Sequence, residues 1–284
     1  MKKYEFTGET KFWADITVRR IRALVNVGAT VQAGDLGGWI EKESNLFNDA
    51  SDGAWIFDNA IVIGNAHVSS DARVFDDARV SGDAHVFGNA NVSGNAYLFG
   101  NASVFGNARV SDNARVFGDA RVFGDASVFG NAHLFGNARV SDNARVFGDA
   151  SVSGDASVSG DARVSDNAHV SGDASVSGNA HVSDNASVSG NASVSGNASV
   201  SGNASVSDFS ELIYAGRRSD GYEFVAFLAD GELIVIAGCR YFTMAQARHH
   251  WETTRGGTPL GNETTIILDH IDAMAKAREW VFKS

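Results

Sequence analysis

Five histidines hold equivalent positions in a repeating pattern and are the first candidates for chemistry. Near neutral pH an imidazole can act as a general acid, a general base or a metal ligand. Each of the five directly follows an alanine: His67, His85, His133, His169 and His181. Other copies of the pattern place Arg73, Asn91 or Ser103 there. Because acid–base catalysis also needs a pocket and an orienting partner, we interpret these histidines as solvent-exposed repeat variants and predict no catalytic residue.

The few histidines and the single cysteine argue against a metal site or a redox site. His67 and His85 are three repeat units apart, and two ligands without a third are a weak metal signal. Cys239 is the only cysteine, which excludes intramolecular disulfides, cysteine zinc clusters and iron–sulfur sites. We therefore predict no metal site and no cofactor.

The pattern behind these positions has a period of six residues. Alanine recurs at every sixth position from Ala54 to Ala204, 26 times without a gap, and an aliphatic residue follows two positions later. Such a hexad can form a short strand centred on the aliphatic residue. The Gly-Asn or Gly-Asp pair that follows tolerates positive φ and can form a corner. Repeated strands and corners predict a mainly β chain wound as a solenoid with alanine and valine inside.

The hexads resemble those of the hexapeptide-repeat proteins, which form left-handed parallel β-helices. The resemblance covers residues 54–207. The left-handed winding is implied by this resemblance alone, because the general rule for parallel crossovers would favour a right-handed one. The resemblance also implies three hexads per turn, hence about 8.7 turns and a shaft of ~40 Å at ~4.8 Å per turn. The opening KYEFTGETK and the run LGGWIEKESNL further resemble a group of bacteriophage and prophage proteins, some labelled transferases from the repeat alone.

Phenylalanines follow the valine in many hexads and, because valine points inward, they should point outward. A step of 18 residues would stack them into ladders on successive turns. We weigh two interpretations equally: stacking that stabilises the solenoid and a contact surface. The candidate interface residues are Phe87, Phe99, Phe105, Phe117, Phe123, Phe129, Phe135 and Phe147.

Arginines lie on the same strands, among them Arg109, Arg121 and Arg145. They could bind an acidic partner, but we expect local ion pairs with acidic residues such as Asp119 and Asp125.

The run FGNARVSDNARVFGDA occurs at 105–120 and again at 135–150, five hexads later. Because five is not a multiple of three, we expect the copies on different faces, as in a spacer.

The two ends break the hexad pattern and should cover the exposed ends of the solenoid. We divide the chain into an N-terminal β cap (1–53), the β-helix (54–207) and a C-terminal α+β module (208–284). Trp39 and Trp55 are predicted lids over the first turn. In the module, SELIYAG, YEFVAFL and ELIVIAG predict three strands, joined at Ser219–Gly221 and Asp230–Gly231. Two helices should follow, from Thr243 through Trp251 and from Asn262 or Glu263 to Phe282, completing a β-β-β-α-α module.

Charge and composition narrow the function. Hydrophobic residues make up 44% of the chain and only one proline is present, which favours a folded protein over a disordered one. The net charge of −11 makes direct nucleic-acid binding improbable. The opening MKKYEFTGET lacks the apolar segment of a secretion signal, and no membrane-length apolar run occurs. We therefore expect a cytoplasmic protein, in the host cytoplasm if a phage encodes it.

Our leading hypothesis is a non-enzymatic, elongated scaffold or protein-binding solenoid of phage type. We expect a homo-oligomer, a trimer or a dimer, and a protein partner whose identity the sequence does not give. A variant of this hypothesis is an acidic inhibitor that mimics nucleic acid toward a host protein. The alternative is an acyltransferase using acyl-coenzyme A, a function known among hexapeptide-repeat proteins.

Overall fold

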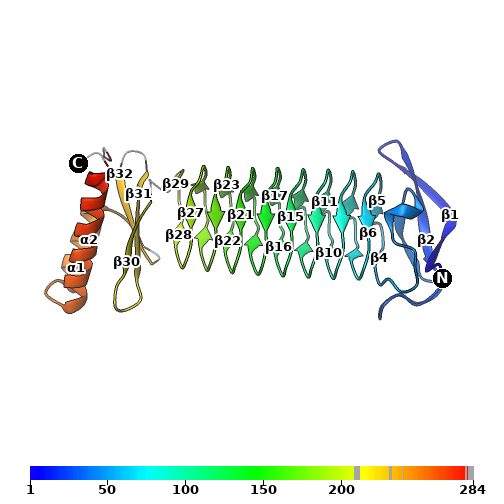
Figure 1. The fold of residues 1–284 in the computed structure, drawn as a ribbon, viewed down its shortest axis with the longest axis horizontal. Helices are drawn as coiled ribbons and strands as arrows, with labels where there is room; N and C mark the ends of the chain where they lie inside the picture. The colour runs from blue at the N-terminus through cyan, green and yellow to red at the C-terminus, as the bar shows by residue number, and fades with distance from the viewer. Residues whose placement is uncertain (208–211, 230–231, 239, 279, 281–284) are drawn as a thin grey trace.

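The computed structural model describes residues 1–207, 212–229, 232–238, 240–278 and 280. Figure 1 shows a long rod: a stack of similar turns, with antiparallel strands at the N-terminal end and a sheet with two helices at the other. The rod is a mainly β solenoid of about nine turns, as the hexads predict.

The solenoid consists of short strands that recur every six residues. Twenty-six strands of two residues run from β4 (Trp55–Ile56) to β29 (Ser205–Val206), all within the described residues 1–207. Each strand from β4 to β26 pairs in parallel with the third strand after it, as β13 (Arg109–Val110) does with β16 (Ser127–Val128). A turn therefore takes 18 residues, and the strands form three parallel sheets along the rod.

Backbone hydrogen bonds between turns hold the stack together. In the hexad around Val110, Arg109 N donates to Ala126 O (2.9 Å), Ser111 N to Val128 O (3.0 Å) and Asn113 N to Gly130 O (2.9 Å). The same three bonds recur along the rod. Because a two-residue strand has little intrinsic stability, the solenoid depends on these bonds between turns.

The interior is filled by small aliphatic side chains. Ala108 and Val110 are fully buried, as are the equivalent residues in nearly every hexad. Burying a valine stabilises the folded state by about 1.5–3 kcal/mol. This continuous core runs the length of the rod, so chemistry on the solenoid can take place only on its outer surface.

The corners require positive φ, which explains why glycine and aspartate alternate there. Gly136 has φ +69° and Asp112 has φ +60°. The Asp112 carboxylate accepts a hydrogen bond from Gly130 N on the next turn (3.0 Å), and Asp76 does the same for Gly94 N (2.9 Å). An aspartate at the corner thus gains a bond that offsets part of its backbone strain.

The first turn begins before the hexad pattern does. Strand β3 (Leu36–Ile40) pairs in parallel with β5 (Ile61–Val62), which places Ile40 in line with Val62. After the short 3₁₀ helix η1 (Glu43–Asn45), Leu46 bridges to Val68 in the same manner. The pattern is hidden in the sequence because Leu46 and Ile56 are ten residues apart instead of six.

An antiparallel hairpin covers this end. Strands β1 (Tyr4–Trp13) and β2 (Ile16–Ala23) extend the sheet that contains β3. Val18 packs on Ile61 and Ile63, which take outward positions that are polar in most other hexads. The hairpin therefore explains the wholly apolar sequence Ile61–Ile63.

The prediction that Trp39 and Trp55 are lids over the first turn is wrong. Trp39 pairs with Ile61 and Trp55 with Arg73, both in the outward position of their hexads. Trp55 is only 1% exposed, and Tyr4 packs edge-on against its ring. Both indoles point outward because their strands put the next residue, an isoleucine, inside.

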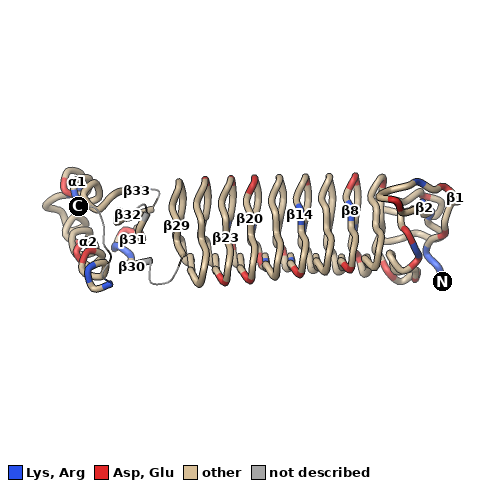
Figure 2. Tube along the Cα trace, turned by 90° about the horizontal axis from the view of Figure 1, so that it is seen from above, with Lys and Arg blue, Asp and Glu red and all other residues tan. Residues whose placement is uncertain are grey.

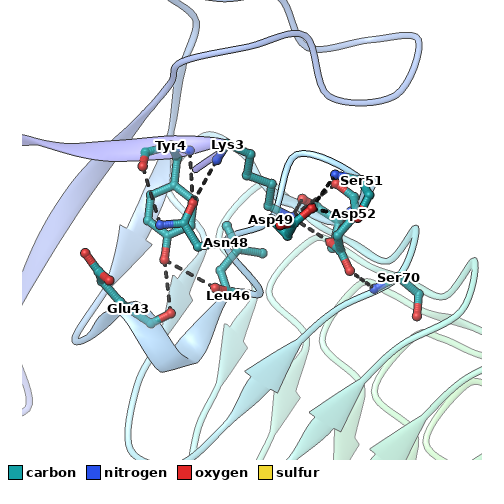
Figure 3. A network of polar contacts seen from close by, with 10 residues as sticks. Lys3, Tyr4, Glu43, Leu46, Asn48, Asp49, Ser51, Asp52 and Ser70 are labelled. Atoms are coloured by element: carbon teal, nitrogen blue, oxygen red, sulfur yellow. Dashed lines mark hydrogen bonds and ion pairs between the residues drawn. The ribbon is translucent and has the colours of Figure 1, made fainter. Parts of the chain in front are cut away.

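A buried ion pair ties the N-terminus to the first corner (Figure 3). Lys3 is fully buried and its Nζ donates to Asp52 Oδ1 (2.6 Å) and to Ala54 O (2.9 Å). Asp52 also accepts from Ser70 N, one turn along, as the corner aspartates do (2.5 Å). Burial lowers the pKa of Lys3, and the hydrogen bond and charge of Asp52 oppose that shift. Asp52 thus links the cap to the solenoid.

The C-terminal module has four strands and two helices. An antiparallel sheet in sequence order is formed by β30 (Leu212–Arg217), β31 (Glu223–Ala229), β32 (Glu232–Ala237) and β33 (Arg240–Thr243). The three predicted strands are confirmed. The fourth was missed because only four residues separate Cys239 from the helix that follows. The predicted turn at Asp230–Gly231 lies outside the described residues.

The helices follow their capping residues. Helix α1 (Met244–Arg255) begins after Thr243 with the predicted capping box to Gln246. Helix α2 (Pro259–Ala277) begins earlier than predicted, because Thr258 caps it and Pro259 suits the first helical position. The predicted end at Phe282 lies outside the described residues, and α2 ends at Ala277.

The C-terminal sheet covers the other end of the solenoid. Phe227, Ile234 and Ile236 on one face join the solenoid core. The opposite face packs on the helices through residues such as Phe224 and Trp251, whose rings lie 5.2 Å apart. The module is therefore a cap with its own second core.

We predict that corner glycines tolerate aspartate better than alanine. A Cβ at Gly136 would lie 3.0 Å from Gly154 N and O, so Gly136→Ala should cost about 1–2 kcal/mol in backbone strain plus this contact. Gly136→Asp should recover about 0.5–1.5 kcal/mol by accepting Gly154 N–H. Thermal unfolding followed by circular dichroism measures both. Gly202→Ala is the control, since it has φ +70° but no atom within 4 Å of the added Cβ; equal losses for Gly136→Ala and Gly136→Asp would contradict the role of the carboxylate.

We also predict an asymmetry in the buried ion pair. Asp52→Asn leaves the Lys3 ammonium buried without a counter-charge and should cost about 3–5 kcal/mol. Lys3→Met should cost less, because Asp52 keeps the backbone donors of Ala54 and Ser70. Urea unfolding, with hydrogen exchange of the β1 and β2 amides, measures the loss. A larger loss of stability for Lys3→Met than for Asp52→Asn would contradict this prediction, because it would show that the unpaired Lys3 ammonium is not the main cost of breaking the ion pair.

Candidate functional site

The predicted phenylalanine ladders are present on the outer surface of the solenoid. Phe105 stacks between Phe87 and Phe123, with ring centroids 4.9 and 5.1 Å apart and rings within 3° of parallel. A second ladder joins Phe99 to Phe117 (4.7 Å) and Phe117 to Phe135 (5.2 Å), and a third joins Phe129 to Phe147 (5.0 Å). The outward orientation inferred from the hexads is therefore confirmed.

The stacking covers much of each ring. Phe87, at the end of its ladder, is 38% exposed, whereas Phe105 and Phe123 are half-buried. An offset aromatic pair contributes about 0.5–1.5 kcal/mol beyond its burial. The stabilising interpretation thus has a geometric basis, and the ring edges that stay accessible keep the contact interpretation open.

The ladders lie along three different corners of the rod. Phe87, Phe105 and Phe123 follow β9 (His85–Val86), β12 (Ser103–Val104) and β15 (Arg121–Val122) of one sheet. The other two ladders follow strands of the other two sheets. The 30-residue duplication behaves as predicted, because its copies put Phe105 and Phe135 on different sheets. No single face collects the phenylalanines.

The arginines do not form the local ion pairs that the sequence led us to expect. Among the described residues, no carboxylate lies within ion-pair distance of Arg109, Arg121 or Arg145. Aspartates at the second corner position, directly before the alanine, instead accept from asparagines one turn earlier, as Asp125 does from Asn107 Nδ2 (2.8 Å). The expectation is wrong because the acidic residues stand at the turns and the arginines on the strands between them (Figure 2).

A shallow basic groove follows from this separation. On the sheet of β13 and β16, Ser127 leaves a gap between Arg109 and Arg145. The groove has a volume of about 380 Å³, and its rim is formed by Asn107, Asp125, Asn143 and Asp161, with Arg163 at its far end. Its guanidinium groups, which form no ion pair with any described carboxylate, could bind carboxylates of a partner protein.

The five histidines take the outward position of their strands, as predicted. The His67 and His85 rings lie on adjacent turns, 6.4 Å apart, and His67 Nδ1 lies 2.7 Å from Ser44 O. Burial, and secondarily the charge of Arg163, lowers the pKa of His181. No group of three or more His, Cys, Asp or Glu side chains in the described part of the chain is arranged to hold a metal ion.

A second hollow, in the C-terminal module, was not anticipated from the sequence. It gathers Arg218, Arg240, His250 and Arg255, which come from three separate elements. Their irregular spacing gives no motif, so only the packing of α1 on the sheet brings them together.

Comparison with known proteins identifies the repeat. Residues 108–122, 138–154 and 156–172 match the model described as the YdcK Beta solenoid repeat. The middle of this solenoid is similar to that repeat. No curated protein matches the chain. None of the helices in the described residues is both long and apolar enough to span a membrane.

We predict that the stacking energy depends on position in the ladder. Phe105→Ser removes two ring contacts and should lower the free energy of unfolding by about 1–3 kcal/mol, whereas Phe87→Ser removes one and should cost about half as much. Serine already holds this position at Ser141, so the fold should survive. Urea unfolding of the two variants and of the double variant measures the coupling. Equal losses at Phe105 and Phe87 would show that stacking is not the source of the stability.

Proposed function

We propose that this protein is a non-enzymatic rod that acts as a scaffold or protein-binding solenoid, of the phage or prophage type that its opening sequence resembles. The observation that carries the proposal is the filled interior. In residues 54–206 nearly every hexad buries an alanine, each buries an aliphatic residue, and one two-residue corner follows another. Binding by the solenoid is therefore limited to its outer surface.

The outer surface offers two features that suit a protein partner. Exposed ring edges along each corner provide apolar contact area. Arginines on the intervening strands, such as Arg109 and Arg145, have no carboxylate partner among the described residues and provide donors for carboxylates. Aromatic residues and arginine are the types enriched at protein interfaces.

The partner can be a second copy of the chain or another protein. We propose that a homo-oligomer, a trimer or a dimer, forms through Phe87 to Phe147. The net charge of −11 and the rod shape also support a role as an acidic inhibitor of a host protein in the cytoplasm. Arginines on the strands make the charge locally mixed, so such mimicry would involve the acidic corners.

The test compares two triple variants along one corner of the rod. The first replaces Phe87, Phe105 and Phe123 by serine. The matched control replaces Ser141, Ser159 and Ser177, the next three residues of the same corner, by alanine. We expect sedimentation equilibrium to show an oligomer for the native chain and the control, and a smaller species for the phenylalanine variant.

Two results would count against the proposal. A native chain that stays monomeric at high concentration, and that retains the same proteins from a lysate with and without the ladder, would leave the phenylalanines a purely stabilising role. Saturable binding of acetyl-coenzyme A at micromolar concentration, measured by calorimetry, would favour the acyltransferase instead.

A further inference from the structure

The C-terminal module contains a partly open basic cavity that the rod-like function does not use. It measures about 250 Å³ and lies between the turn that precedes β31, the start of β33 and the second half of α1. Its lining residues are Arg218, Tyr222, Arg240, His250, Trp251, Thr254 and Arg255.

Arg218 is held rigidly in the wall of this cavity. The residue is 2% exposed, and its Nε and Nη2 donate to the two carboxylate oxygens of Asp220 (2.8 and 2.7 Å). Its Nη1 donates to Thr264 Oγ1 (2.8 Å) on α2. A guanidinium has five N–H groups, so two remain after these three bonds. Asp220 balances the charge of Arg218 while leaving it donors for a ligand.

Two further arginines give the cavity a net positive charge. Within the described part of the chain, neither Arg240 nor Arg255 forms an ion pair with a carboxylate. Arg255 lies in the last turn of α1, where it also faces the partial negative charge of the helix end. That effect is equivalent to about half a charge, so the two arginines still exceed the local negative charge.

A flat aromatic surface adjoins the basic cavity. Phe242 and His250 stack with ring centroids 5.0 Å apart and 28° between their planes. They border an open hollow of about 520 Å³, which shares His250 and Thr254 with the cavity. Burial, and secondarily the charges of Arg240 and His249, lower the pKa of His250.

We propose that this cavity binds a small phosphate monoester with a flat aromatic body. A phosphate monoester carries a charge near −2 at neutral pH, which matches Arg240 and Arg255 better than a single carboxylate does. Planar guanidinium groups bind phosphate oxygens in pairs. The aromatic body would lie over the Phe242–His250 pair. The site does not depend on the solenoid surface, so it is independent of the proposed scaffold role.

The experiment titrates the full chain with phenyl phosphate, inorganic phosphate and phenol, using calorimetry and the ring signals of His250 in NMR spectra. We expect phenyl phosphate to bind in the submillimolar range, inorganic phosphate at least tenfold more weakly, and phenol not measurably. The His250 signals should move with phenyl phosphate.

Variants assign the binding to the cavity. Arg240→Gln and Arg255→Gln should each weaken phenyl phosphate at least tenfold. Arg248→Gln, on the same helix but paired with Asp269 (2.8 Å), should leave the affinity unchanged. No binding of either phosphate, or equal loss in all three variants, would overturn the proposal. Equal affinity for inorganic and phenyl phosphate would overturn the aromatic part of the site.

Discussion

Hydrogen bonding between successive turns is the constraint on which the structure depends. Each strand is only two residues long, so its N–H and C=O groups must be satisfied by the strands 18 residues away. This register brings equivalent positions of every third hexad into contact. It places small aliphatic residues in the interior and glycine or aspartate at the corners, and it stacks the outward side chains of equivalent hexad positions into columns. The phenylalanine stacks and the asparagine–aspartate bonds result from the same register.

Because each turn depends on its neighbours for hydrogen bonds, the first and last turns of the rod need capping structures. An open end exposes unpaired strand edges and the aliphatic core. The N-terminal end extends one sheet with an antiparallel hairpin and joins it to the first corner through Lys3 and Asp52. The C-terminal end instead places an antiparallel sheet across the core through Phe227, Ile234 and Ile236.

These two kinds of structure offer different surfaces to partners. The solenoid repeats a pattern of exposed side chains over a long distance but encloses no space, so it suits broad contacts with macromolecules. The C-terminal module packs helices on a sheet, and between α1 and that sheet a cavity with converging arginines remains. Small-molecule binding is therefore expected in the module and extended contacts along the rod.

The sequence alone determined the solenoid, its outward phenylalanines and the division of the duplicated run between faces, because a strict six-residue period fixes which side chain points inward. It also determined the helix start at Thr243, where capping chemistry is local. Tertiary structure alone decided the rest. The first turn through Ile40 and Leu46 was hidden by an insertion, and Trp55 is buried because a distant hairpin covers it. The pairing of Lys3 with Asp52, the separation of the strand arginines from the acidic corner residues and the meeting of Arg218 with Arg240 depend on contacts between residues far apart in the chain, and no local spacing in the sequence encodes them.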